Sequence, residues 1–224
     1  MIIIKYLKDT GIKNLDSLII THFDNDHCGG AVDVLGNLKV GKLYVNSISH
    51  NSNQANEIYK TAKKHNVQII SAQKGQVVGQ TDDLIITNYI SDVSGVGDNE
   101  NSIITLIKYK DFTMLFTGDA GIETVNNLLD DIPQNITVLK VGHHGAPGVI
   151  NKKLADYLNP KYSIISTGEN KFGHPSVYTL GLLHKSNILR TDIDNSIKIV
   201  VTKNFCKIQT YNMKKRKYVD KLES

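Results

Sequence analysis

The sequence predicts an α/β protein in which β-sheets and helices form layers. Short β-rich runs alternate with helical patterns along all 224 residues, which is typical of layered α/β folds. The length suits one domain with a substantial core, so we expect a single domain over residues 1–224. A third observation bears on function, because side chains that bind metals repeatedly follow apolar strands.

The composition is that of an ordinary globular chain, with 40% hydrophobic and 21% charged residues. The formal net charge of +4 suits a polyanionic substrate but does not require one. A basic cluster at residues 214–217 predicts a solvated tail over residues 212–224 more strongly than it predicts a nucleic-acid patch.

The two cysteines form no CxxC pattern, which favours a reducing compartment over a disulfide framework. No apolar run approaches the roughly 18 residues of a membrane span. The first residues also lack the apolar core of a signal peptide. We therefore expect a stand-alone chain to be cytoplasmic.

Helix and strand patterns alternate from the N-terminus. Ile2–Gly11 predicts a helix, and the apolar run Asp16–Thr21 predicts a buried strand. Asn53–His65 predicts a helix with one apolar face and a cap at Ser52 or Asn53. The elements expected next are, in order, strands at Val67–Ile70 and Leu84–Ile90, a hairpin of Ser102–Tyr109 and Phe112–Thr117, a helix at Gly121–Leu129, a strand at Thr137–Val141, a helix at Leu154–Leu158, a strand at Tyr162–Ser166, a helix from a Ser176 cap to Lys185, and strands at Ser196–Val201 and Phe205–Tyr211.

The densest group of metal-binding side chains follows the first predicted strand. His22, Asp24, Asp26 and His27 lie within six residues, and imidazole and carboxylate groups are suitable ligands for zinc, manganese or iron. A tight turn would direct the first two to one place and the last two to an adjacent place, with Gly29–Gly30 turning the backbone into the next helix. A polar surface loop is the alternative, but chance rarely produces this density at a strand end.

Two later strands also end at candidate ligands. Asp119 follows Gly118 at the end of an apolar strand, where a carboxylate can bridge two metals; the alternative is a cap for the helix that starts near Gly121. His143 and His144 follow another strand, so that one can bind metal while the other supports it or faces the substrate.

Other polar residues have more than one reading. His174 lies in a loop between a glycine and a proline, where it is a ligand, a substrate contact or a plain loop histidine. Asn101 either contacts substrate, holds a ligand or belongs to a turn. His50, His65 and His184 have no such context, and we expect them to be structural.

The run from His22 to His27 resembles the signature of the metallo-β-lactamase superfamily, with Asp24 where many members carry a second histidine. This variant resembles the ComEC branch of that superfamily, which occurs in DNA-uptake competence proteins. Further segments resemble the same branch in the same order: Glu100–Ser102, Leu115–Asp119, Lys140–Gly145, Phe172–Pro175 and Leu189–Asp192. Ala146 departs from the branch, which usually has serine there.

The resemblance implies an αββα sandwich with two divalent metal ions, zinc or manganese, between the sheets at one edge. It implies one metal held by His22, Asp24 and Asp119, and another held by Asp26, His27, Asp119 and His143. Asp26 would also orient the attacking water, while His144, His174 and Asn101 would support the ligands or face the substrate. The first N-terminal strands of the sandwich are expected to be missing, which exposes a sheet edge. A chain derived from a ComEC-type protein would lie outside the cytoplasmic membrane.

These features predict a metal-dependent hydrolase that uses a metal-activated water. A phosphodiesterase or nuclease acting on DNA or RNA is the first choice, because the motifs are ComEC-like and the net charge is mildly positive. Lys140, Lys171 or Asn101 would help to bind an anionic group. Two alternatives stay open: hydrolysis of a small ester, amide or lactam, and a non-catalytic DNA-binding or accessory domain.

Overall fold

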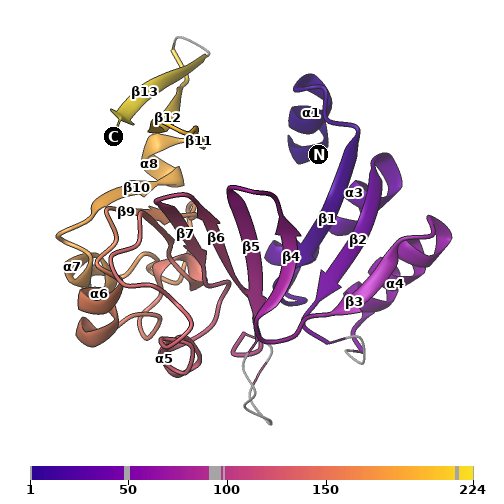
Figure 1. Ribbon diagram of the computed structural model, residues 1–224, viewed down its shortest axis with the longest axis horizontal. Helices are drawn as coiled ribbons and strands as arrows, with labels where there is room; N and C mark the ends of the chain where they lie inside the picture. Colours follow the sequence, from indigo (N-terminus) through magenta and orange to yellow (C-terminus); the bar gives the residue numbers. More distant parts are fainter. Residues whose placement is uncertain (1, 48–50, 91–96, 98, 215–216, 224) are drawn as a thin grey trace.

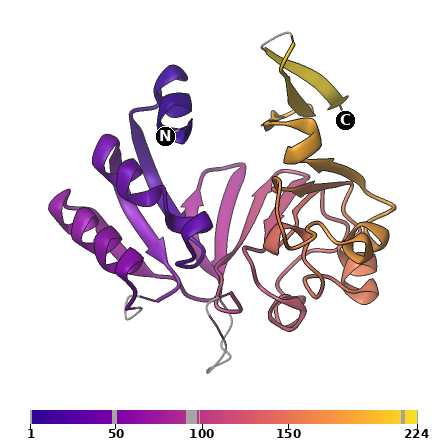
Figure 2. The same ribbon diagram turned by 180° about the vertical axis from the view of Figure 1, so that it is seen from behind.

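The protein is described by a computed structural model that covers residues 2–47, 51–90, 97, 99–214 and 217–223. Its strands form a three-stranded parallel sheet, a seven-stranded mixed sheet and a three-stranded antiparallel sheet. The first two sheets are the central layers, and helices cover their outer sides (Figures 1 and 2). This is the αββα sandwich that the resemblance implies.

The first sheet is parallel and is covered by helices on its outer side (Figure 1). Its strands, in spatial order, are β1 (Asn14–Ile20), β2 (Lys39–Val45) and β3 (Gln68–Ser71). The covering helices are α1 (Ile2–Asp9), α3 (Ala31–Asn37) and α4 (Asn53–Lys64). Leu35 of α3, Leu43 of β2 and Ile58 of α4 are fully buried in one cluster, because each helix turns an apolar stripe towards the sheet.

The second sheet changes from antiparallel to parallel along the chain. Its strands are β4 (Gln76–Gln80), β5 (Leu84–Tyr89), β6 (Ile104–Tyr109), β7 (Phe112–Phe116), β8 (Val138–Lys140), β9 (Tyr162–Ile165) and β10 (Asn187–Arg190). Neighbours from β4 to β7 pair antiparallel, and neighbours from β7 to β10 pair parallel. The outer helices are α5 (Ile122–Asn126), α6 (Lys152–Leu158) and α7 (Val177–Leu182). Their buried side chains join those of the sheet in one core.

The third sheet packs against the opposite face of the parallel half of the second. It contains β11 (Ile197–Val201), β12 (Cys206–Asn212) and β13 (Lys217–Glu223), and the short helix α8 (Thr191–Asp194) precedes it. Ile208 of β12 is fully buried with Val138 and Tyr162. Part of the expected solvated tail is therefore a strand, because β13 pairs with β12 and the ring of Tyr218 contacts that of Tyr211.

Most predicted elements are confirmed to within a few residues, including the Ser52 cap of α4, whose hydroxyl accepts from Ala55 N. The helix predicted to reach Leu129 ends at Asn126 instead. The chain then continues in tighter turns, which bring the next apolar side chains into the core. The strands β2, β4, β10 and β13 were not predicted. β2 and β4 each contain a glycine, and β4 has an irregular register beside Gly79.

The strand β1 lies at the edge of the first sheet, as the resemblance implies. A pocket of about 510 Å³ opens beside it, lined by residues of the first sheet and by Val78 of β4. Within the ranges described above, no helix is both long enough and apolar enough to cross a membrane.

Candidate metal centre

The ends of three strands bring the predicted ligands together. His22 lies two residues after the end of β1, Asp24 is the N-cap of the short helix α2 (Asn25–Cys28), and Asp26 and His27 lie within that helix. Asp119 follows β7 and His143 follows β8, and these two strands are parallel neighbours in the second sheet. Ile103 N donates to Thr21 O at 2.9 Å, which ties the end of β1 to the start of β6. Residues far apart in sequence therefore meet at one edge of the sandwich.

His22, His27 and Asp119 form the buried part of the cluster. One ligand atom from each lies within 4.8 Å of the other two, and the two imidazole rings are 4.2 Å apart between centroids. His27 Nε2 lies 3.2 Å from Asp119 Oδ1. Asp24 Oδ2 lies 3.7 Å from His22 Nε2, so the carboxylate of Asp24 borders the same space.

A second group of possible ligands shares His27 and reaches solvent. Asp26, His27 and His144 also place ligand atoms within 4.8 Å of one another. Asp26 Oδ2 lies 3.6 Å from His27 Nε2 and 3.0 Å from His144 Nε2. His143 Nε2 lies 3.9 Å from Asp119 Oδ2, while His143 N donates to Asp119 Oδ1. His144 therefore takes a more direct part in this group than the resemblance implies.

Two buried imidazole nitrogens indicate that these residues fit a divalent metal. Within the described part of the chain, neither His22 Nε2 nor His27 Nε2 has a hydrogen-bond partner. His27 Nε2 and Asp119 Oδ1 are thus close together, but their geometry is not that of a hydrogen bond. Unpaired buried polar atoms are costly. Metal coordination would satisfy both nitrogens, and imidazole and carboxylate groups are the ligands that zinc and manganese accept.

Ser102 is a supporting residue that the sequence did not single out. Its fully buried hydroxyl lies 3.2 Å from His22 Nδ1 and accepts a hydrogen bond from Asp119 N at 3.1 Å. Gly118 makes this approach possible, because its φ is +54° and an added Cβ would lie 2.7 Å from Ser102 Cβ. One hydroxyl therefore positions two predicted ligands. The sequence signal was its place in Glu100–Ser102, a segment that resembles the ComEC branch.

Burial and charge shift the pKa values within the cluster. Burial lowers the pKa of His22, and the neighbouring His27 lowers it further. Burial also opposes protonation of His27, but contact with Asp119 and the charges of Asp119 and Asp26 outweigh it, so that the pKa is raised. Burial works against ionisation of Asp119, yet His27, His143 and His22 lower its pKa to about 2. Asp119 is therefore an anion at neutral pH, as a metal ligand must be.

The turn that carries His143 and His144 has an unusual backbone. It is a 3₁₀ turn (His143–Gly145) in which the φ angles of the two histidines are +44° and +52°. Residues other than glycine rarely adopt this left-handed region, and such strain occurs often at functional sites. His144 Nδ1 lies 2.8 Å from Ser166 O, so both ring nitrogens of His144 face oxygen atoms.

His174 approaches the cluster from the loop between β9 and α7. Its ring lies 5.8 Å from that of His143, and its Nδ1 is buried with no hydrogen-bond partner among the residues described. Burial first, and then the charges of His143 and His144, lower the pKa of His174. The loop packs closely against the histidine turn: Ser176 N donates to Gly145 O, and an added Cβ at Gly145 would lie 2.7 Å from Pro175.

The remaining predictions have mixed outcomes. Asn101 lies in a turn in which its backbone N donates to Gly97 O, and the role of its side chain stays a prediction. Glu100, rather than Asp119, serves the start of α5, because its carboxylate accepts from Gly121 N and Thr124 Oγ1. Lys140 Nζ donates to Val141 O, and burial lowers its pKa.

Gly29 and Gly30 were expected to allow a sharp turn of the backbone into the next helix, and this reason was wrong. Gly29 and Gly30 both have ordinary helical backbone angles, so neither makes a turn that only glycine allows. Gly29 is needed for space instead, since an added Cβ would lie within 3 Å of the side chain of Asn25. His50 lies outside the described residues. His65 ends α4 and His184 contacts Gly181 O, away from the cluster.

Comparison with known proteins agrees with this fold. The model of the metallo-β-lactamase superfamily matches residues 1–169, so the chain belongs to that superfamily. It is 31% identical over 204 residues to ComE operon protein 3 of Bacillus subtilis (strain 168), covering 88% of this chain and 26% of that protein. It is 24% identical over 212 residues to competence protein ComA of Neisseria gonorrhoeae, covering 92% of this chain and 28% of that protein.

The chain thus spans about a quarter of the length of these curated relatives. Among solved structures, the diiron β-hydroxylase CmlA from Streptomyces venezuelae has a TM-score of 0.54 at 13% identity, covering 80% of this chain and 44% of that chain. This likeness concerns the fold alone.

Proposed function

We propose that this chain is a metal-dependent hydrolase that cleaves phosphodiester bonds in nucleic acid. The observation that carries the proposal is the junction of three strand ends, where His22 Nε2 and His27 Nε2 lie beside the anionic Asp119 and have no hydrogen-bond partner among the described residues. Buried carboxylate and imidazole groups that lack hydrogen bonds to each other destabilise a fold, but the same groups can coordinate a metal ion. The same arrangement is what the motifs of the superfamily imply.

We assign the ligands to two metals as the resemblance to the superfamily implies. His22, Asp24 and Asp119 would hold one divalent ion, and Asp26, His27, Asp119 and His143 would hold a second. When bound, such ions make water more acidic and neutralise negative charge on phosphate oxygens. Zinc and manganese both suit this mixed nitrogen and oxygen donor set.

Asp26 and His144 are suited to the proton transfers of hydrolysis. Asp26 Oδ2 can accept the proton that water loses as it attacks phosphorus. When His144 is protonated at Nε2, it can donate this Nε2 proton to the oxygen of the departing alcohol. The 3.0 Å contact between Asp26 and His144 then lets the first proton pass to the imidazole and restores both groups. Ser166 O holds the imidazole in place throughout.

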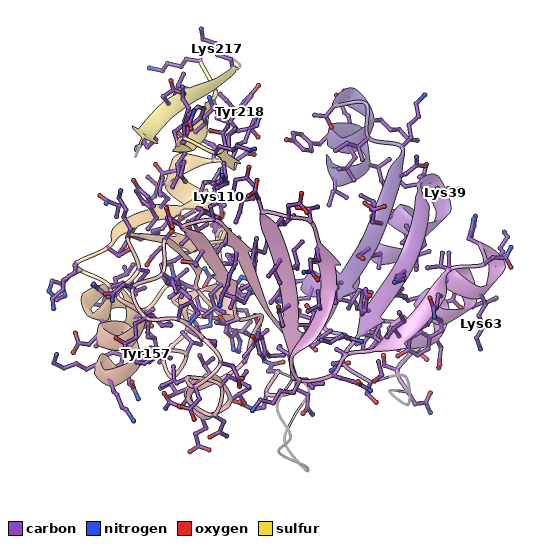
Figure 3. The ribbon with its side chains drawn as sticks, in the orientation of Figure 1. Lys39, Lys63, Lys110, Tyr157, Lys217 and Tyr218 are labelled. Atoms are coloured by element: carbon purple, nitrogen blue, oxygen red, sulfur yellow. The ribbon has the colours of Figure 1, made fainter. Side chains whose placement is uncertain are left out.

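The choice of phosphodiesters rests on the relatives and on charge. One relative is named a competence protein, and the ComEC-like motifs resemble those of DNA-uptake proteins. The net charge of +4 favours a polyanion. The labelled lysines Lys39, Lys63, Lys110 and Lys217 lie on separate parts of the molecule (Figure 3).

The test compares metal content and turnover in the wild type and in Asp119→Ala. Both proteins are purified without chelator, and bound metal is measured by elemental analysis. Cleavage of single-stranded DNA, double-stranded DNA and bis-p-nitrophenyl phosphate is measured with Mn²⁺ and with Zn²⁺. Asp156→Ala is the matched control, because this carboxylate pairs with lysines on α6 and at Lys185, remote from the cluster.

We expect near-stoichiometric metal and phosphodiesterase activity in the wild type and in Asp156→Ala. Asp119→Ala should lose both, with a fall in activity of at least about 100-fold, since it removes the ligand that both metals would share. Bound metal without phosphodiester cleavage would instead favour a small ester, amide or lactam as substrate. A folded wild type with neither metal nor turnover would sink the enzyme proposal.

A further inference from the structure

Phe172 presents an exposed aromatic ring beside the candidate metal centre. Its side chain is 80% exposed, although it lies in the loop between β9 and α7 that carries His174. A single exposed apolar side chain is ordinary. The position of this ring relative to the site is what makes it informative.

The Phe172 ring continues a row of rings that starts at a proposed metal ligand. It stacks on His174, with 5.7 Å between centroids and an angle of 21° between planes. The His174 ring in turn meets the His143 ring edge-on at 5.8 Å. One face of Phe172 is therefore turned towards the site, and its high exposure leaves the ring open to solvent and to a further ring.

Hydrogen bonds within the loop fix the backbone that carries this ring. The Asn170 side chain accepts hydrogen bonds from Phe172 N at 3.1 Å and from His174 N at 3.0 Å. Its amide nitrogen also donates to His174 O and Gly168 O. A ring on a fixed backbone loses less conformational entropy when it binds a flat partner than a ring on a free loop.

We propose that Phe172 is a stacking platform for a nucleobase next to the phosphodiester that is cleaved. This inference rests on the proposed function and names its substrate class as single-stranded nucleic acid. Every base has a π-face that can stack on an aromatic ring, whatever the sequence. In a duplex both faces of every base except the terminal ones are already stacked on neighbouring bases, so the interior of a duplex cannot use the platform. The exposed Lys171 directly precedes Phe172 in the sequence and adds positive charge that attracts the phosphate backbone of the nucleic acid.

The test measures stacking directly, apart from catalysis. A short single-stranded oligonucleotide with phosphorothioate linkages and one 2-aminopurine base is titrated with metal-loaded protein, and base fluorescence reports stacking. The variants are Phe172→Ala, Phe172→Leu and Phe172→Trp. Phe205→Ala is the matched control, because Phe205 is also exposed, at 39%, but lies on the β11–β12 turn. Cleavage of unmodified single-stranded and double-stranded DNA is measured in parallel.

We expect Phe172→Ala and Phe172→Leu to lose the quenching and to bind the oligonucleotide about 5- to 100-fold more weakly. KM for single strands should rise in proportion, while duplex cleavage stays unchanged. Phe172→Trp should retain quenching and affinity, and Phe205→Ala should behave as the wild type. Retention of quenching and affinity by Phe172→Leu would overturn the proposal, because a leucine is apolar but cannot stack.

The two proposals fail in different ways. If the wild type cleaves DNA and all Phe172 variants bind and cleave equally well, the platform is wrong and the phosphodiesterase stands. If the wild type cleaves no phosphodiester but quenches 2-aminopurine in a Phe172-dependent manner, Phe172 binds a nucleobase, and both the hydrolysis and the placement of that base beside a cleaved bond are wrong. Thermal unfolding of each variant confirms that it is folded, as expected for a change at an exposed side chain.

Discussion

Ser102 illustrates how a single buried hydroxyl can organise a metal centre. It lies against His22 Nδ1, which Thr21 Oγ1 also contacts at 3.1 Å, and it accepts from Asp119 N, so it helps to fix the direction in which His22 Nε2 points. Groups that contact a ligand on its far side commonly raise metal affinity by orienting the ligand. The left-handed backbone of Gly118 provides the space that this arrangement requires.

Ser102→Ala should lower metal affinity by about 10- to 100-fold, because it removes this orienting contact but leaves every proposed ligand in the sequence. Affinity is measured by competition with a chromophoric chelator. Ser163→Ala is the matched control, since Ser163 is fully buried on β9 and contacts Ser186 away from the site. Equal metal affinity in Ser102→Ala and the wild type would contradict the role assigned to this hydroxyl.

At the scale of elements, the loop between β9 and α7 depends on the start of α8, which lies beside it. The Thr191 hydroxyl donates to Thr167 O at 2.6 Å and accepts from Thr167 N at 2.8 Å. Next to Thr191, Arg190 forms a bidentate salt bridge with Asp192. The segment that resembles the late Arg-Thr-Asp of the ComEC branch thus supports the loop that carries His174.

Thr191→Val should loosen this loop, because valine has a similar shape but makes neither hydrogen bond. The expected loss of stability is about 1–2 kcal/mol. Trypsin should also cleave faster after the exposed Lys171 of the loop, as followed by mass spectrometry. Thr61→Val on α4 is the control, since its hydroxyl contacts only the preceding helical turn at Glu57. Unchanged cleavage after Lys171 would show that other contacts hold the loop.

At the scale of the whole molecule, the candidate ligands join segments that are distant in sequence. They come from residues 22–27, from Asp119 and from His143, and they span both central sheets. The unfolded chain does not hold these groups together. A metal ion should therefore bind the native state far more tightly than the unfolded state.

Metal removal should accordingly destabilise the whole fold. At a free metal concentration of 100 times Kd, binding stabilises the native state by about 2.7 kcal/mol. Addition of EDTA should lower the Tm of the wild type and leave that of Asp119→Ala unchanged. An equal drop in both proteins would mean that the chelator acts somewhere other than this cluster.

Much of the fold could be predicted because its signals are local. The helix α4 has an apolar stripe and a serine cap, and the β6–β7 hairpin has two β-rich runs around a short turn. The strands β2, β4, β10 and β13 escaped prediction, because short, charged or glycine-containing segments become strands only by pairing with a neighbour. The length of α5 depended on core packing in the same way.

The order of residues was enough to indicate the α/β layers and to identify the chemistry at the strand ends, since strand periodicity and metal-binding side chains are both visible in a linear chain. It could not supply the relations between distant segments. The hydroxyl of Ser102 against His22, the contact of His144 with Asp26 and the stacking of Phe172 on His174 all depend on how the two sheets and their loops pack. Such contacts arise only when tertiary packing closes long loops, so no local pattern records them.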